Sequence, residues 1–286
     1  MFLISGFWQS VLGLATRPNS QDAAHVCPED LCPISAYIDP ALSPAEWAQS
    51  FLHFEADRKQ VEVLNHDAHR LILCCSRQWG KSTVIAIKAF HFALHNPGTE
   101  ILITSDTEAH AGIIVSKIGN YAAVLGIPVS RVLGKRFSIC LPNHSRIFAV
   151  PATERAVVGY TANIIIVDEA AIAPDEVVSY LTRTLTQTNG AIWLLSTPRG
   201  QLGIFYHIWH AEPSRWLKIK ATVDDCPYVS PEFLEEQKLL FPDIFRQEFY
   251  CEFVQPAGRL LSRERFAKNV DPALNCRLIP DEGDPQ

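Results

Sequence analysis

One stretch of sequence decides the fold: Leu71-Ile-Leu-Cys-Cys-Ser-Arg-Gln-Trp-Gly-Lys-Ser-Thr83. Its first five residues are uncharged and mostly aliphatic, which predicts a strand buried on both faces of a sheet. A polar loop follows, and residues 82–95 then carry Ala, Ile and Phe in a helical pattern. Backbone N–H groups of such a loop, together with the dipole at the helix N-terminus, attract an anionic phosphate. We therefore expect a phosphate-binding loop between this strand and this helix.

Three residues of the loop have expected roles with a bound nucleotide. Gly80 would let the backbone approach the phosphates, Lys81 would reach the β- and γ-phosphates, and the Ser82 hydroxyl would ligate Mg²⁺. The usual pattern has a glycine five residues before Gly80, where this chain has Cys75. Taken alone, Gly-Lys-Ser also fits an ordinary polar turn between a strand and a helix, so a second motif has to support the prediction.

That second motif is Asn163-Ile-Ile-Ile-Val-Asp-Glu-Ala-Ala171, a predicted buried strand that ends in two carboxylates. In a parallel sheet we expect this strand to lie beside the phosphate-binding loop, with its carboxyl end in the same crevice. Asp168 would then hold Mg²⁺, and Glu169 would orient and deprotonate the attacking water. The Asp-Glu pair could instead cap the next helix, but two such motifs at strand ends favour an ATPase.

A third strand end, Ala191-Ile-Trp-Leu-Leu-Ser-Thr-Pro-Arg-Gly200, brings two hydroxyls near the same crevice. Ser196 and Thr197 could bond the catalytic water or the acidic pair, and so respond to the γ-phosphate. Uncharged runs at 71–75, 101–104, 164–167 and 192–195 alternate with helical patterns at 82–95, 108–125 and 174–187. This alternation predicts an α/β fold with a parallel sheet flanked by helices. Residues 137–150, with a turn at 142–145, predict an inserted β-hairpin.

Composition excludes several other classes. The formal net charge of −6 argues against a protein that coats nucleic acid through bulk charge, although a local basic groove stays possible. The eight cysteines form no Cys-x-x-Cys pair for a zinc site, and several lie in apolar runs, as free thiols do in a reducing cytosol. No apolar run is long enough to cross a membrane. These features predict a cytoplasmic protein without a membrane partner.

In this order, the motifs at 76–82, 167–171 and 195–200 resemble the large terminase subunit of tailed bacteriophages, specifically its N-terminal packaging ATPase. The Walker A loop of that family commonly begins with Ser-Arg-Gln, which accounts for the missing first glycine. The resemblance runs in family order from about Gln60 to Phe253. Further matching segments are 143–147 with Pro151 and Ala152, Gly159-Tyr160 and 245–253.

The resemblance implies a P-loop NTPase fold of the RecA/ASCE type and hydrolysis of ATP with Mg²⁺. It implies that Gln60 contacts adenine, that Arg77 reaches the γ-phosphate in cis, and that Ser196 and Thr197 couple hydrolysis to DNA movement. Catalysis would then fall to Glu169, Lys81 and Arg77, and metal binding to Ser82 and Asp168. The expected ATP-binding residues are Gln60, Ser76, Arg77, Gln78, Trp79, Gly80, Lys81, Ser82 and Thr83.

The expected partners also come from the resemblance. They are double-stranded DNA, further copies of this chain in a homo-oligomeric ring, a portal protein and a small terminase subunit. Two departures limit the match. Val158 stands where the family usually has an arginine, and about 33 residues after Phe253 leave no room for the family's nuclease domain. We therefore expect no nuclease activity.

The expected organisation is an N-terminal extension at 1–55, an ATPase domain at 56–254 and a linker or truncated tail at 255–286. The ATPase domain would include a small lid-like segment after Trp216. Two alternatives remain open at this point. One is a fragment of a superfamily 2 helicase, which carries similar motifs, and the other is a prophage remnant that binds ATP without hydrolysing it.

Overall fold

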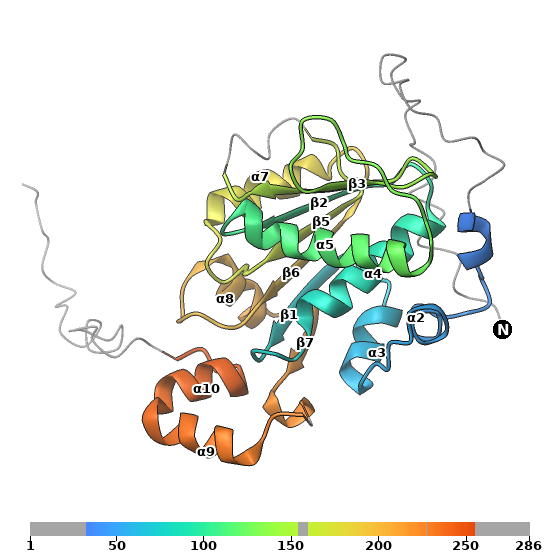
Figure 1. Cartoon of the computed structure of the whole chain (residues 1–286). Coiled ribbons are helices and arrows are strands. Elements are labelled where there is room, and N and C mark those ends of the chain that lie inside the picture. The colour runs from blue at the N-terminus through green and yellow to red at the C-terminus, as the bar shows by residue number, and fades with distance from the viewer. Residues whose placement is uncertain (1–32, 154–159, 227, 255–286) are drawn as a thin grey trace, which may run out of the picture. The chain divides into compact units, whose positions relative to one another are not determined.

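The computed structural model describes residues 33–153, 160–226 and 228–254 (Figure 1). Within them lies one seven-stranded sheet with the strand order β3-β4-β2-β5-β6-β1-β7. All neighbouring strands run parallel except β3, which pairs antiparallel with β4 at one edge. The strands are β1 (Arg70–Cys75), β2 (Glu100–Ser105), β3 (Ser138–Cys140), β4 (Arg146–Pro151), β5 (Ile164–Asp168), β6 (Ala191–Ser196) and β7 (Leu217–Ala221).

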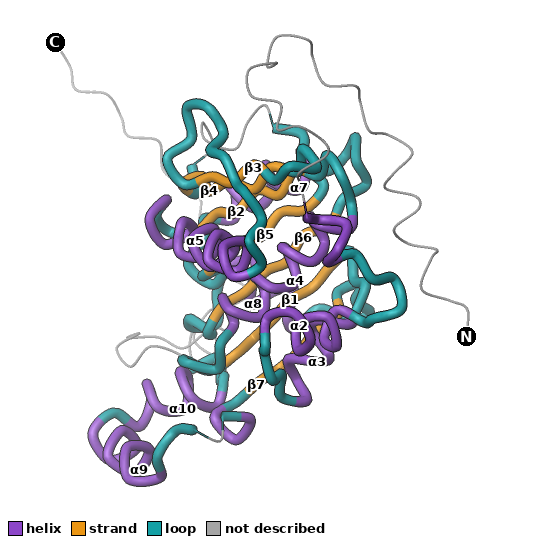
Figure 2. The backbone as a smooth tube through the Cα atoms, turned by 45° about the vertical axis from the view of Figure 1, so that its right-hand side comes forward, coloured by secondary structure: helices purple, strands orange, loops and turns teal. Residues whose placement is uncertain are grey.

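Two layers of helices cover the sheet, and the alternation of side chains along β1 shows why. Leu71 and Leu73 belong to a core shared with α4 (Lys81–His95) and α5 (Glu108–Val124). Ile72 faces the other way, into a core shared with α7 (Asp175–Thr184) and α8 (Gly203–His210). Successive side chains of a strand point to opposite faces, so a strand with apolar residues at every position suits a sheet covered on both sides. Figure 2 shows the strands running through the middle of these helices.

The predicted α/β fold is confirmed, as are the four predicted buried strands, now β1, β2, β5 and β6. The predicted helices correspond to α4, α5 and α7 within a few residues. The predicted hairpin is also present, but only β3 is an addition to the sheet's edge, because β4 pairs parallel with β2. Its turn is tied to the end of α4, since Asn143 Nδ2 and Ser145 Oγ both donate to the carbonyl of Ala93.

Part of the predicted N-terminal extension packs against the ATPase domain, so that prediction needs correction. The short helix η2 (Pro33–Tyr37) is followed by α2 (Pro44–Leu52) and α3 (Arg58–Asn65). Ser43 begins α2 with a capping box to Glu46, as the serine at this position predicts. The Trp47 side chain is fully buried and contacts Phe90 of α4 with ring centroids 6.0 Å apart. Residues 1–32 of the predicted extension lie outside the described residues.

The predicted lid-like segment after Trp216 begins inside the sheet, which is a second correction. Residues of β7 pair with β1 along its length, and the helical part follows only after η3 (Val223–Asp225). It consists of α9 (Pro231–Leu240) and α10 (Pro242–Tyr250), which pack around Phe245, Phe249 and Val223. The predicted tail at 255–286 lies outside the described residues. None of the described helices is long and apolar enough to span a membrane.

Candidate nucleotide site

The loop between β1 and α4 has the backbone that its glycine and its neighbours dictate. Gly80 is the N-cap of α4 at φ 95°, a left-handed conformation that side chains disfavour, and Gln78 has φ 64°. Gln60 supports this loop from α3, because its Nε2 donates to the carbonyl of Trp79 at 3.0 Å. A capping box in which Gln60 bonds Asp57 holds the glutamine side chain in place.

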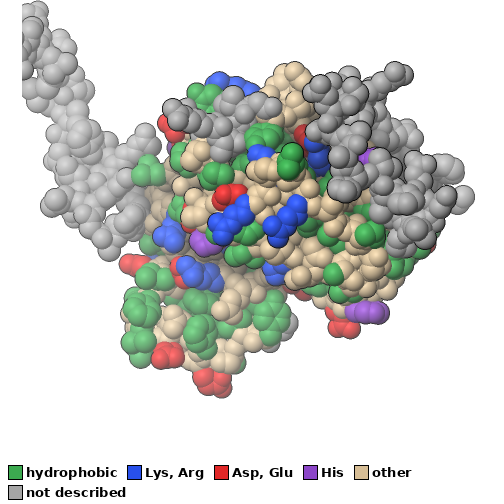
Figure 3. Space-filling view, turned by 45° about the horizontal axis from the view of Figure 1, so that its top comes forward, with side chains coloured by type: hydrophobic (Ala, Val, Ile, Leu, Met, Phe, Trp, Pro, Cys, Tyr) green, Lys and Arg blue, Asp and Glu red, His purple; other side chains and the backbone are tan. Residues whose placement is uncertain are grey.

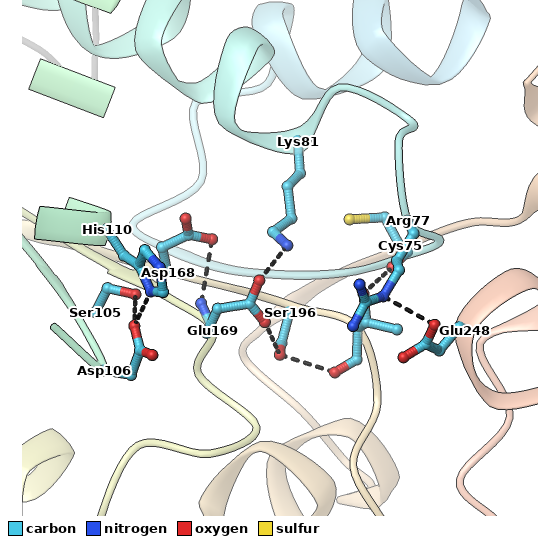
Figure 4. A network of polar contacts seen from close by, with 11 residues as sticks. Cys75, Arg77, Lys81, Ser105, Asp106, His110, Asp168, Glu169, Ser196 and Glu248 are labelled. Atoms are coloured by element: carbon cyan, nitrogen blue, oxygen red, sulfur yellow. Dashed lines mark hydrogen bonds and ion pairs between the residues drawn. The ribbon is translucent and has the colours of Figure 1, made fainter. Parts of the chain in front are cut away.

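The carboxylates of Asp168 and Glu169 reach this loop although β5 does not adjoin β1. The prediction that the acidic strand lies directly beside the phosphate loop is wrong, because β6 lies between the two strands. Their carboxyl ends nevertheless open on one crevice, and Lys81 Nζ donates to Glu169 Oε1 at 2.5 Å (Figure 4). Glu169 itself sits at φ 52°, a left-handed conformation at the end of the strand. This contact brings the predicted phosphate lysine and the predicted catalytic carboxylate together.

Burial and charge set the protonation of this cluster. Burial raises the pKa of Asp168 to about 6, and the charge of Glu169 adds to the effect, while Lys81 and a hydrogen bond with Ser82 oppose it. For Lys81, burial lowers the pKa, but the nearby charges of Asp168 and Glu169 outweigh it and leave the pKa raised. Lys81 is therefore a fixed cation at the floor of the crevice.

The two predicted coupling residues connect the acidic pair with the end of β1. Ser196 Oγ lies 3.4 Å from Glu169 Oε2 and donates to the carbonyl of Thr197 at 2.8 Å. Thr197 Oγ1 donates to the carbonyl of Cys75 at 3.1 Å, and both hydroxyl residues are buried. The end of β6 is thus hydrogen-bonded to the catalytic carboxylate on one side and to the strand before the phosphate loop on the other.

A cavity of ≈ 450 Å³ lies over these groups. Beside it, Arg77 Nε pairs with Glu248 Oε2 of α10 at 2.8 Å, and the backbone N–H of Arg77 donates to the carbonyl of Glu248 at 3.0 Å. Figure 4 shows the Arg77 side chain directed toward Glu248 rather than toward Lys81. The lining residues are Arg77, Gln78, Lys81, Ser82, Asp106, His110, Ile113, Asp168, Glu169, Ile172, Thr197, Pro198, Arg199 and Glu248.

Four expected ATP-binding residues lie outside the cavity lining. The Trp79 side chain is fully buried and its Nε1 has no hydrogen-bond partner in the described part of the chain, so only its backbone can meet a ligand. Thr83 accepts a hydrogen bond from Lys117, and the buried Ser76 hydroxyl lies 3.6 Å from Cys226 Sγ. Gln60 is likewise buried behind the loop.

Sequence reasoning missed the pair Asp106 and His110, which lines the far wall of the cavity. His110 Nδ1 and Asp106 Oδ1 are 2.6 Å apart, and Ser105 bonds the same carboxylate oxygen. Asp106 follows directly after β2, the strand next to β5. The signal was available, since a polar residue at the carboxyl end of a central parallel strand is well placed to meet a ligand.

The fold and the site define a class: a P-loop ATPase with a phosphate-binding loop, a metal-binding aspartate position and an adjacent carboxylate base. The family model for the N-terminal part of the T4likevirus-type terminase large subunit matches residues 72–268. The chain belongs to this family, whose class is the ATPase domain of the large terminase. This membership favours the terminase over the helicase alternative. Residues 255–268 of the match lie outside the described residues.

Solved structures of phage large terminases share the fold. The ATPase domain from Thermus phage P74-26 is 24% identical over 74% of this chain and 100% of its own, with a TM-score of 0.64. Another large terminase, from a thermophilic bacteriophage and solved with ATP-γ-S, is 16% identical over 70% of this chain and 53% of its own, at 0.58. The HK97 large terminase is 15% identical over 75% and 54%, at 0.60. This chain thus spans about half the length of the latter two chains, and no curated protein sequence matches it.

Proposed function

We propose that the cavity binds Mg²⁺·ATP and hydrolyses it to drive double-stranded DNA into a viral procapsid. The observation that carries the proposal is the contact of 2.5 Å between Lys81 and Glu169, which joins the two predicted chemical groups in one crevice. The large terminase of the thermophilic bacteriophage supports the nucleotide, because it was solved with ATP-γ-S and with ADP. Family membership supports the DNA-packaging role.

The oxygen donors present fit a magnesium ion. Ser82 begins α4 beside the buried Asp168, and the hydrogen bond between them brings a hydroxyl and a carboxylate together at the phosphate end of the cavity. Hard oxygen ligands of this kind suit Mg²⁺, which also keeps several waters and binds the phosphates of its nucleotide. When bound, the ion would neutralise charge on the β- and γ-phosphate oxygens.

Glu169 is the group that we propose as the general base. A water oxygen would attack the γ-phosphorus while the bond from that phosphorus to the β–γ bridging oxygen breaks, giving ADP and inorganic phosphate. The proton of the water would pass to the Glu169 carboxylate. Incoming phosphates would compete with Glu169 for Lys81, and the carboxylate released from the lysine could then turn to the water.

The remaining partners are proposals that follow from the family. We place the protein in the host cytoplasm, as part of a homo-oligomeric ring around DNA that docks on a portal and works with a small terminase subunit. Ser196 is the residue best placed to transmit the state of the site, since it contacts Glu169. Through Thr197 the same strand end contacts β1.

The test is Mg²⁺-dependent ATP hydrolysis with and without linear double-stranded DNA, for the unaltered chain and for Glu169→Gln. We expect the variant to bind ATP but to lose at least about 10²-fold in kcat, because general-base catalysis contributes about 10²–10⁴-fold. DNA should stimulate the unaltered chain. Binding without hydrolysis in both proteins would instead identify the non-catalytic remnant, and turnover that survives Glu169→Gln would remove Glu169 from its role.

A further inference from the structure

The three Lys and Arg side chains that line the cavity differ in how their charge is used. Lys81 pairs with Glu169, and Arg77 pairs with Glu248. Arg199 also lines the cavity, but it is exposed and makes no ion pair or hydrogen bond within the described part of the chain. It is therefore the cation that can meet a ligand without first giving up an acidic partner.

The backbone that carries Arg199 is held on both sides. Before it, the Thr197 hydroxyl bonds the carbonyl of Cys75 at the end of β1. After it, the N–H of Gly200 donates to Gln247 Oε1 of α10 at 3.5 Å, and Gly200 adopts φ 64°. Pro198 fixes one further backbone angle. An exposed side chain on an anchored turn keeps its own freedom but projects from a fixed point, as a charge that acts on a bound ligand must.

The position of Arg199 relative to the reacting groups points the same way. It follows Ser196 by three residues, and Ser196 lies against the Glu169 carboxylate. Phosphoryl transfer spreads negative charge over the terminal phosphate oxygens, and a guanidinium stabilises that charge through paired N–H groups. Lys81 supplies one cation at the floor of the site, whereas Arg199 lies on the wall formed by the end of β6.

We propose that Arg199 is a catalytic residue that contacts the terminal phosphate of the nucleotide bound in its own chain and stabilises the transition state. The proposal rests on the proposed function, because it assigns one more group to the same ATPase site. Its chemistry requires an anion with a terminal phosphate, so Arg199 should distinguish ATP-like ligands from ADP. In the ligand-free state it leaves the ion pairs of Lys81 and Arg77 undisturbed.

Arg199→Ala tests this with kinetics and with binding. We expect kcat to fall at least about 10²-fold with little change in KM, since groups that act mainly in the transition state affect kcat most. Affinity for the transition-state mimic ADP·aluminium fluoride should fall at least about 10-fold, while affinity for ADP stays the same. Arg199→Lys should restore part of kcat. The control is Arg215→Ala, which removes an exposed arginine away from the cavity and should change nothing.

A mixing experiment decides whether Arg199 acts in its own chain. No chain in a mixture of Arg199→Ala and Glu169→Gln carries both groups, so hydrolysis should stay low if Arg199 acts in cis. Recovery of hydrolysis in the mixture would show that a neighbouring copy supplies Arg199 and would overturn the proposal. Equal losses of ADP and ADP·aluminium fluoride binding would also overturn it, since they indicate a structural role.

The binding measurement separates this inference from the proposed function. If the unaltered chain hydrolyses no ATP, the ATPase proposal fails, but comparison of ADP with ADP·aluminium fluoride still tests Arg199. If the unaltered chain hydrolyses ATP and Arg199→Ala matches it in kcat and in both affinities, only the Arg199 proposal is wrong.

Discussion

At the scale of single residues, the phosphate-binding loop depends on a close fit between Gly80 and Gln60. A Cβ atom added at Gly80 would lie 3.3 Å from Gln60 Nε2, the atom that holds the carbonyl of Trp79. The left-handed φ of Gly80 adds a second penalty for any side chain there. The glycine therefore serves the shape of the loop twice, through its backbone angle and through the space it leaves for the glutamine.

Gly80→Ala should weaken nucleotide binding more than it weakens the fold. The strained backbone would cost about 1–3 kcal/mol, and the loop would shift away from Gln60. We expect the Kd for ATP to rise at least about 10-fold, measured by titration with a fluorescent ATP analogue. Gly98→Ala is the matched control, because Gly98 has φ 73° but nothing within 4 Å of an added Cβ. It should lower the melting temperature and leave Kd unchanged, and an equal rise in Kd for both variants would contradict this prediction.

The residue types at strand ends could be predicted from the sequence, but their pairings could not. Lys81, Asp168 and Glu169 are recognisable because each follows a short apolar run, and the structure brings them together. The contact between Arg77 and Glu248 joins residues far apart in the chain, and no local pattern marks it. Asp106 was also missed, although it follows β2 directly, because no recognised motif surrounds it.

At the scale of elements, α2 shows how composition can hide packing. The prolines around it suggest a loose extension, yet Trp47 turns α2 into a helix buried against α4. The capping pattern at Ser43 was visible in the sequence, whereas the partner of Trp47 was not. The alternation of strands and helices was predictable for the same reason that β5 was misplaced. Periodicity along the chain identifies an element, but it does not give its neighbours in the sheet.

The contact between α2 and α4 should make the fold sensitive to acid. The rings of His91 and His95 stack with centroids 4.0 Å apart, next to Trp47, and both Nε2 atoms are buried without a hydrogen-bond partner in the described chain. Burial lowers the pKa of His91 to about 3, and the charges of His95 and Lys88 add to this. Because the folded state disfavours the proton, His91 stabilises the fold above pH 6.5. That contribution should disappear as pH falls from about 6.5 toward about 3.

We expect the free energy of unfolding to drop by up to about 1.4 kcal/mol per pH unit in this window from His91 alone. Urea denaturation between pH 4 and pH 8 measures it. His91→Phe keeps the aromatic contact with Trp47 and should flatten the acid slope, while His207→Phe, at an exposed position on α8, should keep the slope of the unaltered chain. The prediction would be wrong if both variants showed the same slope.

At the scale of the whole described domain, the helical pair α9 and α10 is linked to the nucleotide site through Arg77. The side chain and the backbone N–H of Arg77 both contact Glu248, so the phosphate-binding loop and α10 are joined at one point (Figure 4). Figure 3 shows hydrophobic and acidic side chains together on the lower part of this face, where α9 and α10 lie. Exposed apolar residues concentrate there, including Leu239, Leu240 and Ile244. This region thus combines a contact to the site with a surface suited to a partner.

The link also sets a competition, because the guanidinium that holds Glu248 is the one expected at the γ-phosphate. Its ion pair is half exposed on the arginine side, so it contributes only about 0.2–1 kcal/mol and can be exchanged. Glu248→Gln removes the competing charge. It should lower the Kd for ATP by up to about 5-fold, the equivalent of about 1 kcal/mol, and leave the Kd for ADP unchanged. Glu252→Gln is the control, since Glu252 pairs with Arg246 and does not line the cavity. Equal tightening of ATP and ADP by Glu248→Gln would show that Glu248 does not compete with the γ-phosphate for Arg77, and no tightening of either would show that Arg77 does not reach it.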